Sequence, residues 1–382
     1  MNILIRIQER GNDTKVKRIL SMMLTTVLLM GTSTITNATE IKDEESPQLL
    51  EAVSNLKTGY SEYYDIMDAE TTLCSSDEIN GNIENIYLLE MEVVLKADSV
   101  EQMDYFQGIE SYYEMAEENV SRINSEDSRL RMKALSCEKE CIYEELQEYI
   151  GKQQNLIFYI KEIYPIDNES NKEILFENGM DYVSWEVMLP SGHEELQKNG
   201  YARMASIEDD LIEEDTSLQQ ARASYSVDDA VDYMLKYTSN ASSCNICGKG
   251  KCSNKVDTTK YNSAYTHYIS VGKHVDCANY VSQALYEGGI STDDTWKAGS
   301  SAWIGVSALT KYMTDNKYWT SLSYSSVKKG DIVSYTSYSH VVMITSYDGT
   351  THKYSGHSND RKNTVININT NTASNYKFYR VS

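Results

Sequence analysis

Between residues 46 and 218, apolar side chains recur mainly at three- and four-residue intervals within acidic stretches. Over residues 101–124 and 127–154 this spacing places them on one face, which predicts two surface helices. Residues 86–95 and 182–189 are richer in Val, Ile, Tyr and Trp and alternate between polar and apolar positions, so we expect a strand in each. The first half of the chain is therefore predicted to be mainly helical, with some β-structure.

The pattern changes after residue 225, where short amphipathic helices are followed by strands. Helices are expected over residues 228–237, 276–287 and 303–313, and Gly288-Gly289 would end the second of them. Strands bounded by Gly, Asp, Asn or Ser are expected over residues 332–335, 340–345, 353–357 and 376–381. Helices that precede an antiparallel sheet give an α+β layout.

Length and charge divide the chain into two parts. At 382 residues, two domains are the default expectation. Residues 1–222 hold 45 acidic and 19 basic side chains, a net charge of −26, whereas residues 223–382 hold 12 and 16, a net charge of +4. The polar stretch over residues 208–226 suits an exposed linker. We therefore predict an acidic accessory domain with its linker over residues 39–222 and a second domain over residues 223–382.

The first 38 residues have the pattern of a secretory signal peptide. Lys15, Lys17 and Arg18 precede an apolar run over residues 19–30, and residues 36–38 suit a signal peptidase. The run is shorter than the ~20 residues that span a bilayer, so no stable membrane insertion is expected, although a retained anchor stays open as an alternative. The mature protein is expected to be secreted or associated with the cell wall.

The candidate chemistry lies in residues 276–283, which read Asp-Cys-Ala-Asn-Tyr-Val-Ser-Gln. Cys277 would stand at a helix start, where peptide N–H groups without intrahelical partners stabilise a thiolate, so its pKa is expected to fall below that of a free cysteine. His340 and His357 follow in strand-like surroundings. A cysteine with imidazoles available is typical of thiol-dependent acyl transfer. Taken singly, each of these residues would more often be part of a packed core.

Residues 225–382 resemble the amidase domain family of secreted Firmicute proteins, which is related to NlpC/P60 and papain-like cysteine hydrolases. In place of that family's Asp-Cys-Thr-Asn-Phe-Val-Ser-Gln, this chain has Ala278 and Tyr280 at the third and fifth positions. The similarity continues through Gly288-Gly289, Ser301-Ala302-Trp303, Gly330-Asp331 and His340-Val341-Val342. The resemblance implies an α+β, papain-like domain of the NlpC/P60 type with cysteine amidase or peptidase activity.

The resemblance also implies roles for individual residues. Cys277 is the nucleophile, and His340 is the general base that takes its proton. A third polar residue on the following strand would orient the imidazole. His357 is the first candidate for this role, and Asn359 is the alternative if that strand ends earlier than expected.

Two further residues are expected at the site. Asp276 is expected close to the amine of the substrate, as in NlpC/P60 relatives. The backbone N–H of Cys277 and the side chain of Tyr268 are candidate donors to the oxyanion. The predicted site includes no metal ligand, and no cofactor is expected.

Cys244, Cys247 and Cys252 form a separate cluster before the nucleophile. With His267 or His274 as a fourth ligand they offer the tetrahedral donor set of a zinc site, but a second Cys-x-x-Cys pair is lacking. A disulfide suits an exported protein at least as well. Free thiols are the third alternative, and the sequence leaves all three open.

We expect a secreted cysteine hydrolase that cleaves an amide bond, with cell-wall peptide as its substrate. One alternative is an amidase or peptidase that acts on extracellular proteins or small amides. Another is a non-catalytic cell-envelope binding protein that uses the fold as a scaffold. The acidic chain lacks the basic clusters with interleaved aromatic residues that bind phosphates, so no nucleic acid partner is expected. The sequence does not indicate an oligomeric state.

Overall fold

A computed structural model describes residues 45–123, 126–213, 225–247, 254–270, 273–316 and 318–381. The predicted signal peptide and residues 214–224 of the predicted linker lie outside this described part. From Ser46 onward the described residues form one compact unit that contains two larger antiparallel sheets. Within the same ranges, no helix combines the length and hydrophobicity needed to cross a lipid bilayer.

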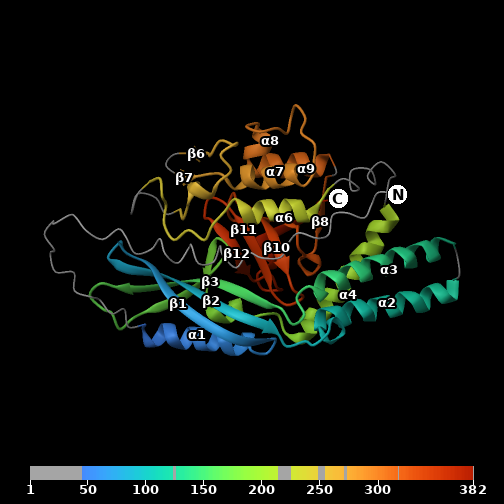
Figure 1. Cartoon of the computed structure of the whole chain (residues 1–382), viewed down its shortest axis with the longest axis horizontal. Coiled ribbons are helices and arrows are strands. Elements are labelled where there is room, and N and C mark those ends of the chain that lie inside the picture. Colours follow the sequence, from blue (N-terminus) through green and yellow to red (C-terminus); the bar gives the residue numbers. More distant parts are fainter. Residues whose placement is uncertain are drawn as a thin grey trace, which may run out of the picture. The chain divides into compact units, whose positions relative to one another are not determined.

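In the described part of the chain, the first sheet has five antiparallel strands in the order β1-β2-β3-β4-β5. Its strands β1, β2 and β3 are labelled in Figure 1. Their bounds are β1 Tyr64–Ile79, β2 Asn82–Leu95, β3 Gln153–Pro165, β4 Glu173–Asn178 and β5 Asp181–Val183. The turn between β1 and β2 is Asn80-Gly81, and both residues have positive φ, at 53° and 82°. Such a two-residue turn matches the twist of the strands that it joins. The turn therefore sets the register of this long hairpin.

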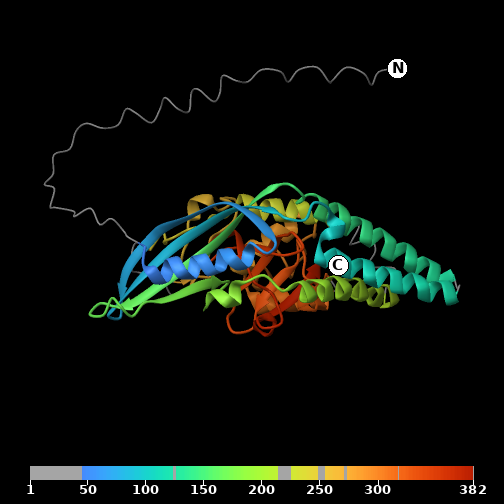
Figure 2. The ribbon, with the colours of Figure 1, turned by 90° about the horizontal axis from the view of Figure 1, so that it is seen from below.

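Helices accompany this sheet, with the bounds α1 Pro47–Tyr60, α2 Asp104–Ile123, α3 Glu126–Gln147 and α4 His193–Glu213. α1 follows Ser46, whose hydroxyl accepts the N–H of Leu49 at 3.2 Å and caps the helix. The apolar face of α1 lies on the sheet (Figure 2). Gly108 on α2 and Gly200 on α4 each face a backbone carbonyl of the other helix. Because any side chain there would collide with that carbonyl, the two glycines allow α2 and α4 to pack closely.

The second sheet, as far as the chain is described, has six strands in the order β12-β11-β10-β9-β13-β8. Their bounds are β8 Trp319–Leu322, β9 Ile332–Tyr335, β10 Val341–Tyr347, β11 His352–Gly356, β12 Arg361–Ile366 and β13 Tyr376–Val381. The helices that precede it are α6 Val227–Lys236, α7 Cys277–Glu287, α8 Ser301–Ile304 and α9 Val306–Asp315. α6 and α7 pack against each other and on β10 (Figure 1). A small ribbon, β6 Ile269–Ser270 with β7 Lys273–His274, leads into α7.

The α+β class with antiparallel sheets is confirmed, and so are the predicted helices that correspond to α2, α3, α6 and α7. Of the predicted strands, those that correspond to β2, β9, β10, β11 and β13 are confirmed, with ends that differ by a few residues. The helix expected over residues 303–313 is divided at Gly305 into α8 and α9. No strand is predicted for β8 or β12, so the sequence pattern accounts for four of the six described strands of the second sheet.

The first half departs from its pattern in two ways. The strand predicted over residues 182–189 is wrong, because the chain stays extended only to Val183 and then forms a 3₁₀ helix at Trp185–Met188. The region is also richer in β-structure than predicted, since β1, β3 and β4 are not among the predicted strands. β1 in particular is largely polar and partly exposed along its length, so it lacks a buried apolar face that would mark it.

A buried ion pair joins the two larger sheets. The Nη2 atom of Arg361 on β12 donates to Oε2 of Glu177 on β4 at 2.6 Å, and the guanidinium lies 3.8 Å from the ring centroid of Tyr159 on β3. Arg361 is 1% exposed and Glu177 is 3% exposed. Tyr347 and Val365 from the second sheet also extend the apolar core of the first. The acidic region and the second sheet are thus held together by buried contacts.

We expect Glu177→Gln to lower the free energy of unfolding by about 3–5 kcal/mol, because it leaves the buried Arg361 guanidinium without its counter-ion. Urea unfolding of the full chain measures this loss. The matched control is Glu194→Gln, which removes an exposed pair with Lys198 on the surface of α4 and should change the unfolding free energy little. Equal losses in the two variants would contradict the role given to the buried pair.

Candidate active site

α7 presents Cys277 as its first residue, directly after Asp276 at the N-cap. The backbone carbonyl of Asp276 accepts the N–H of Tyr280 at 2.9 Å and closes the first turn of the helix. The carboxylate of Asp276 is not used to cap the helix backbone, so it is available to other segments. Asp276 is 1% exposed and Cys277 is 6% exposed. The start of α7 therefore lies inside the protein.

The Asp276 carboxylate joins several segments. Its Oδ1 accepts the backbone N–H of Tyr268 at 3.1 Å and the side-chain amide of Asn279 at 2.9 Å, and its Oδ2 lies 2.8 Å from Nδ1 of His357. Nδ1 of His267 lies 3.7 Å from Oδ1. Burial on its own would raise the pKa of Asp276, but the surrounding donors, the two imidazoles foremost, outweigh it and lower the pKa to about 2. The carboxylate is therefore ionised at neutral pH.

His357 follows β11 and lies between two tyrosine rings. Tyr261 and Tyr280 stack on its two faces, with ring centroids 3.6 and 3.5 Å away and planes 8° and 3° apart. Its Nδ1 faces Asp276, and its Nε2 lies 2.8 Å from the carbonyl oxygen of Tyr237. A carboxylate and a carbonyl both accept hydrogen bonds, so each ring nitrogen of His357 faces an acceptor. This ring therefore fixes the Asp276 carboxylate in place.

The Cys277 thiol lies against the segment that carries His340. Its Sγ is 4.0 Å from the carbonyl oxygen of Ser339, and the backbone N–H of Val341 also faces the sulfur. His340 directly precedes β10 and is 4% exposed. The predicted nucleophile and the predicted base thus lie on neighbouring segments. His357 was expected to orient the His340 ring, but both of its nitrogens are engaged with other partners.

Burial sets the protonation state of the thiol and of the base. It raises the pKa of Cys277 to about 11, although the backbone N–H groups of Val341 and Ala278 act in the opposite direction. It lowers the pKa of His340 to about 4. The prediction that the helix start lowers the pKa of the thiol is therefore wrong, because desolvation outweighs the helix N–H groups. At neutral pH the two groups are a thiol and a neutral imidazole.

Tyr268 and Asn359, the two remaining predicted site residues, make contacts that differ from the expected ones. Tyr268 gives its backbone N–H to Asp276, whereas the hydroxyl that was expected to bind an oxyanion lies beside Gly299. Asn359, the alternative third residue, donates its side-chain amide to Glu177 at 3.4 Å. It therefore faces the ion pair between the sheets.

The network also contains residues that the sequence does not single out. The side-chain amide of Asn279 donates to Asp276 and, at 3.0 Å, to the carbonyl of Thr266, and its oxygen accepts the indole N–H of Trp303 at 2.8 Å. The sequence could have indicated the contact with Asp276, because Asn279 follows it by three residues and therefore lies on the same face of the helix. Tyr261 carries no such signal, because its contact with His357 arises from the folding of distant segments.

The second cysteine cluster lies next to this network. Sγ of Cys244 and Sγ of Cys247 lie 3.2 and 3.6 Å from Nε2 of His274, and the three potential ligand atoms all lie within 4.8 Å of one another. His267 is turned to His274, with 2.8 Å between Nε2 of the former and Nδ1 of the latter. Of the two histidines that were considered as ligands, His274 is the one that meets the sulfur atoms. Cys252 lies outside the described residues.

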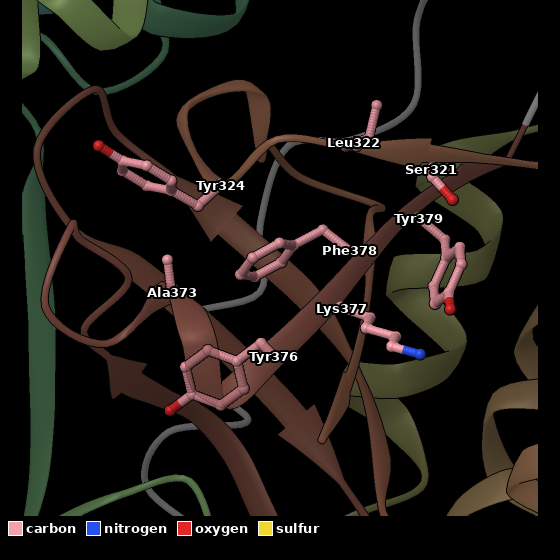
Figure 3. A pocket seen from close by; sticks show the side chains of 8 residues that line it. All are labelled: Ser321, Leu322, Tyr324, Ala373, Tyr376, Lys377, Phe378 and Tyr379. Atoms are coloured by element: carbon pink, nitrogen blue, oxygen red, sulfur yellow. The ribbon is translucent and has the colours of Figure 1, made fainter. Parts of the chain in front are cut away.

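A surface pocket of about 310 Å³ opens beside β8 and β13 (Figure 3). It is lined by Ser321, Leu322, Tyr324, Ala373, Tyr376, Lys377, Phe378 and Tyr379. This lining includes none of the predicted catalytic residues, so we do not assign the pocket to the candidate active site.

Residues 224–381 match a family model described as "Putative amidase domain". The match covers the second sheet, its helices and the whole Asp276 network. It supports the amidase domain family for this segment and indicates a hydrolase that acts on amide bonds. No curated protein and no solved structure matches the chain.

We expect Asp276→Asn to remove an acid-sensitive part of the stability. The folded-state pKa of Asp276 lies below its ordinary value of 3.8, so its contribution is complete above that value and is lost as the pH falls towards 2. Between pH 5 and pH 2 the parent protein should lose about 2 kcal/mol more unfolding free energy than the variant. Urea unfolding at several pH values measures this difference. Asp294→Asn, at a fully exposed carboxylate, is the control and should follow the parent.

An Asp276→Asn variant with the same acid-dependent loss as the parent protein would contradict the role given to this carboxylate.

Proposed function

We propose that this chain hydrolyses an amide bond through a covalent acyl-enzyme on Cys277. The observation that carries the proposal is the position of the thiol, at the first residue of α7 and against the segment of His340, within a part of the chain that matches an amidase domain. A thiol with an imidazole on a neighbouring segment is the pairing that nucleophilic acyl transfer uses.

In the proposed reaction, the Cys277 sulfur attacks the carbonyl carbon of the amide while His340 takes the thiol proton. The electron pair of the C=O bond moves to oxygen, and the backbone N–H of Cys277, which has no partner within the helix, donates to that oxyanion. The C–N bond then breaks, and His340 returns the proton to the departing amine. Water attacks the resulting thioester with His340 as base, which releases the acid and restores the thiol.

The protonation states support proton transfer during the attack itself. Because burial keeps the thiol protonated and the imidazole neutral, a separated thiolate and imidazolium pair is not the resting form. The proton therefore moves as the S–C bond forms. A neutral imidazole at rest is already in the state that a general base requires.

In this proposal Asp276 does not contact the amine of the substrate but positions the start of α7. Its two oxygens accept hydrogen bonds from Tyr268, Asn279 and His357, and the residue is almost fully buried. It holds the start of α7, and with it the sulfur, in one position. Precise placement of a nucleophile contributes to the rate because less motion has to be restricted in the transition state.

We further propose that the protein is secreted, that its substrate is cell-wall peptide and that the acidic region is an accessory domain. The signal-peptide pattern over residues 1–38 and the resemblance to NlpC/P60 hydrolases support this. Extracellular proteins or small amides are the alternative substrates. The 6% exposure of Cys277 favours one further alternative, a non-catalytic binding protein, since a substrate has to reach the sulfur.

Incubation of the full chain with purified cell-wall sacculi, followed by mass spectrometry of the muropeptides, should show new amino groups at one type of bond. Cys277→Ala should reduce their formation at least about a thousandfold, because the nucleophile is lost. Cys137→Ala, at an exposed cysteine of α3, is the matched control and should keep the parent rate.

The outcomes separate the alternatives. Equal activity of Cys277→Ala and the parent would rule out the thiol mechanism. New amino groups from casein or a glutaminyl peptide, but none from sacculi, would favour the alternative substrates. Binding to sacculi without turnover of any substrate would favour the non-catalytic protein.

A further inference from the structure

The side chains of Cys244, Cys247 and His274 converge on one point. Both sulfur atoms face Nε2 of His274, at 3.2 and 3.6 Å, and all three atoms lie within 4.8 Å of one another. Cys244 is 8% exposed and His274 is 3% exposed. Two sulfur atoms and one imidazole nitrogen form a soft donor set of the kind that binds zinc.

The spacing of these atoms agrees with tetrahedral coordination. Zinc lies about 2.3 Å from a thiolate sulfur and about 2.0–2.1 Å from an imidazole nitrogen, which places sulfur and nitrogen roughly 3.6 Å apart in a tetrahedral site. The two observed distances, 3.2 and 3.6 Å, are close to this value. The ligands therefore need little movement to hold the ion.

The loop that carries the cysteines is fixed by its own backbone. The N–H of Cys247 donates to Sγ of Cys244 at 3.3 Å, so the backbone of the second cysteine contacts the sulfur of the first. Cys244 forms a β-bridge with Val256, and the N–H of Asn245 donates to the carbonyl of Val256 at 2.9 Å. The backbone N–H of His274 donates to the side-chain oxygen of Asn254 at 3.4 Å.

One hydrogen bond behind His274, to His267, is compatible with the tautomer that a metal requires. If Nδ1 of His274 donates to Nε2 of His267, at 2.8 Å, the lone pair of Nε2 is free to face the sulfur atoms. His267 then carries its own proton on Nδ1, which lies 3.7 Å from the Asp276 carboxylate. A carboxylate behind a metal-binding histidine is a recurrent arrangement at zinc sites. Here a second histidine stands between the two, and its Nδ1 lies within ion-pair distance but beyond hydrogen-bond distance of the carboxylate.

We propose that Cys244, Cys247 and His274 bind a zinc ion whose role is to fix the chain that leads into α7. The ion would join the loop of the two cysteines to β7. Through His267 it would also help to position the Asp276 carboxylate, which holds the start of α7. The fourth coordination position belongs to a donor other than these three side chains. Binding releases the thiol protons, so no oxidant or reductant is involved.

The test uses the full chain, purified without chelator. Its zinc content is measured by inductively coupled plasma mass spectrometry. The parent and the Cys137→Ser control should contain about one zinc per chain. Cys247→Ser, which removes a direct ligand, should weaken zinc binding by more than the roughly 10–100-fold that follows from loss of an outer partner. His267→Gln, which removes such an outer partner, should fall within that range.

Cobalt(II) added to the metal-free parent gives a second readout that does not depend on how any variant folds. Sulfur-to-cobalt charge-transfer absorption is expected and should reach its limit at one equivalent. No cobalt or zinc binding by the parent, or equal binding by Cys247→Ser, would overturn the proposal. So would an intact mass that shows Cys244 and Cys247 joined as a disulfide. Metal content is independent of turnover, so these outcomes are separate from those for amide hydrolysis.

Discussion

The arrangement of the site depends on one buried carboxylate. Asp276 is ionised and almost inaccessible to water, and a charge in that position is stable only if donors surround it. The donors come from the residue that precedes the β6–β7 ribbon, from the first turn of α7 and from the loop after β11. The need to satisfy one charge therefore joins segments that are far apart in sequence. Cys277, the next residue along the chain, is fixed by the same contacts.

The local elements of the second half of the chain are predictable because they obey short-range rules. Gly288-Gly289 ends α7, and Gly330-Asp331 precedes β9, as the pattern indicates. The strands of the first half are less predictable, because their stability comes from pairing with distant strands. β1 is polar along much of its length, and its partner is determined by the Asn80-Gly81 turn and by the apolar strand β2.

The residues of the site are predictable in identity but not in arrangement. The sequence places Asp276, Cys277 and two histidines in one candidate site, and the structure brings Cys277 near the segment of His340. The sequence alone cannot show that His357 contacts Asp276. The His357 ring is held between Tyr261 and Tyr280, and these contacts join segments that are far apart in the sequence. The predicted pKa of the thiol is wrong because the effect of burial is larger than the effect of the helix start. A helix start is worth about 0.3–1 kcal/mol, whereas a pKa rise from 9.0 to about 11 corresponds to roughly 3 kcal/mol.

The most direct test of catalysis by Cys277 is to trap the intermediate. A single turnover is stopped with acid at successive times, and the peptides of the protein are mapped by mass spectrometry. We predict that the peptide with Cys277 gains the mass of the acyl group as the amine appears, and that it loses this mass as the acid is released. Release of both products while Cys277 stays unmodified at every time, or an acyl group on a different residue, would contradict the mechanism.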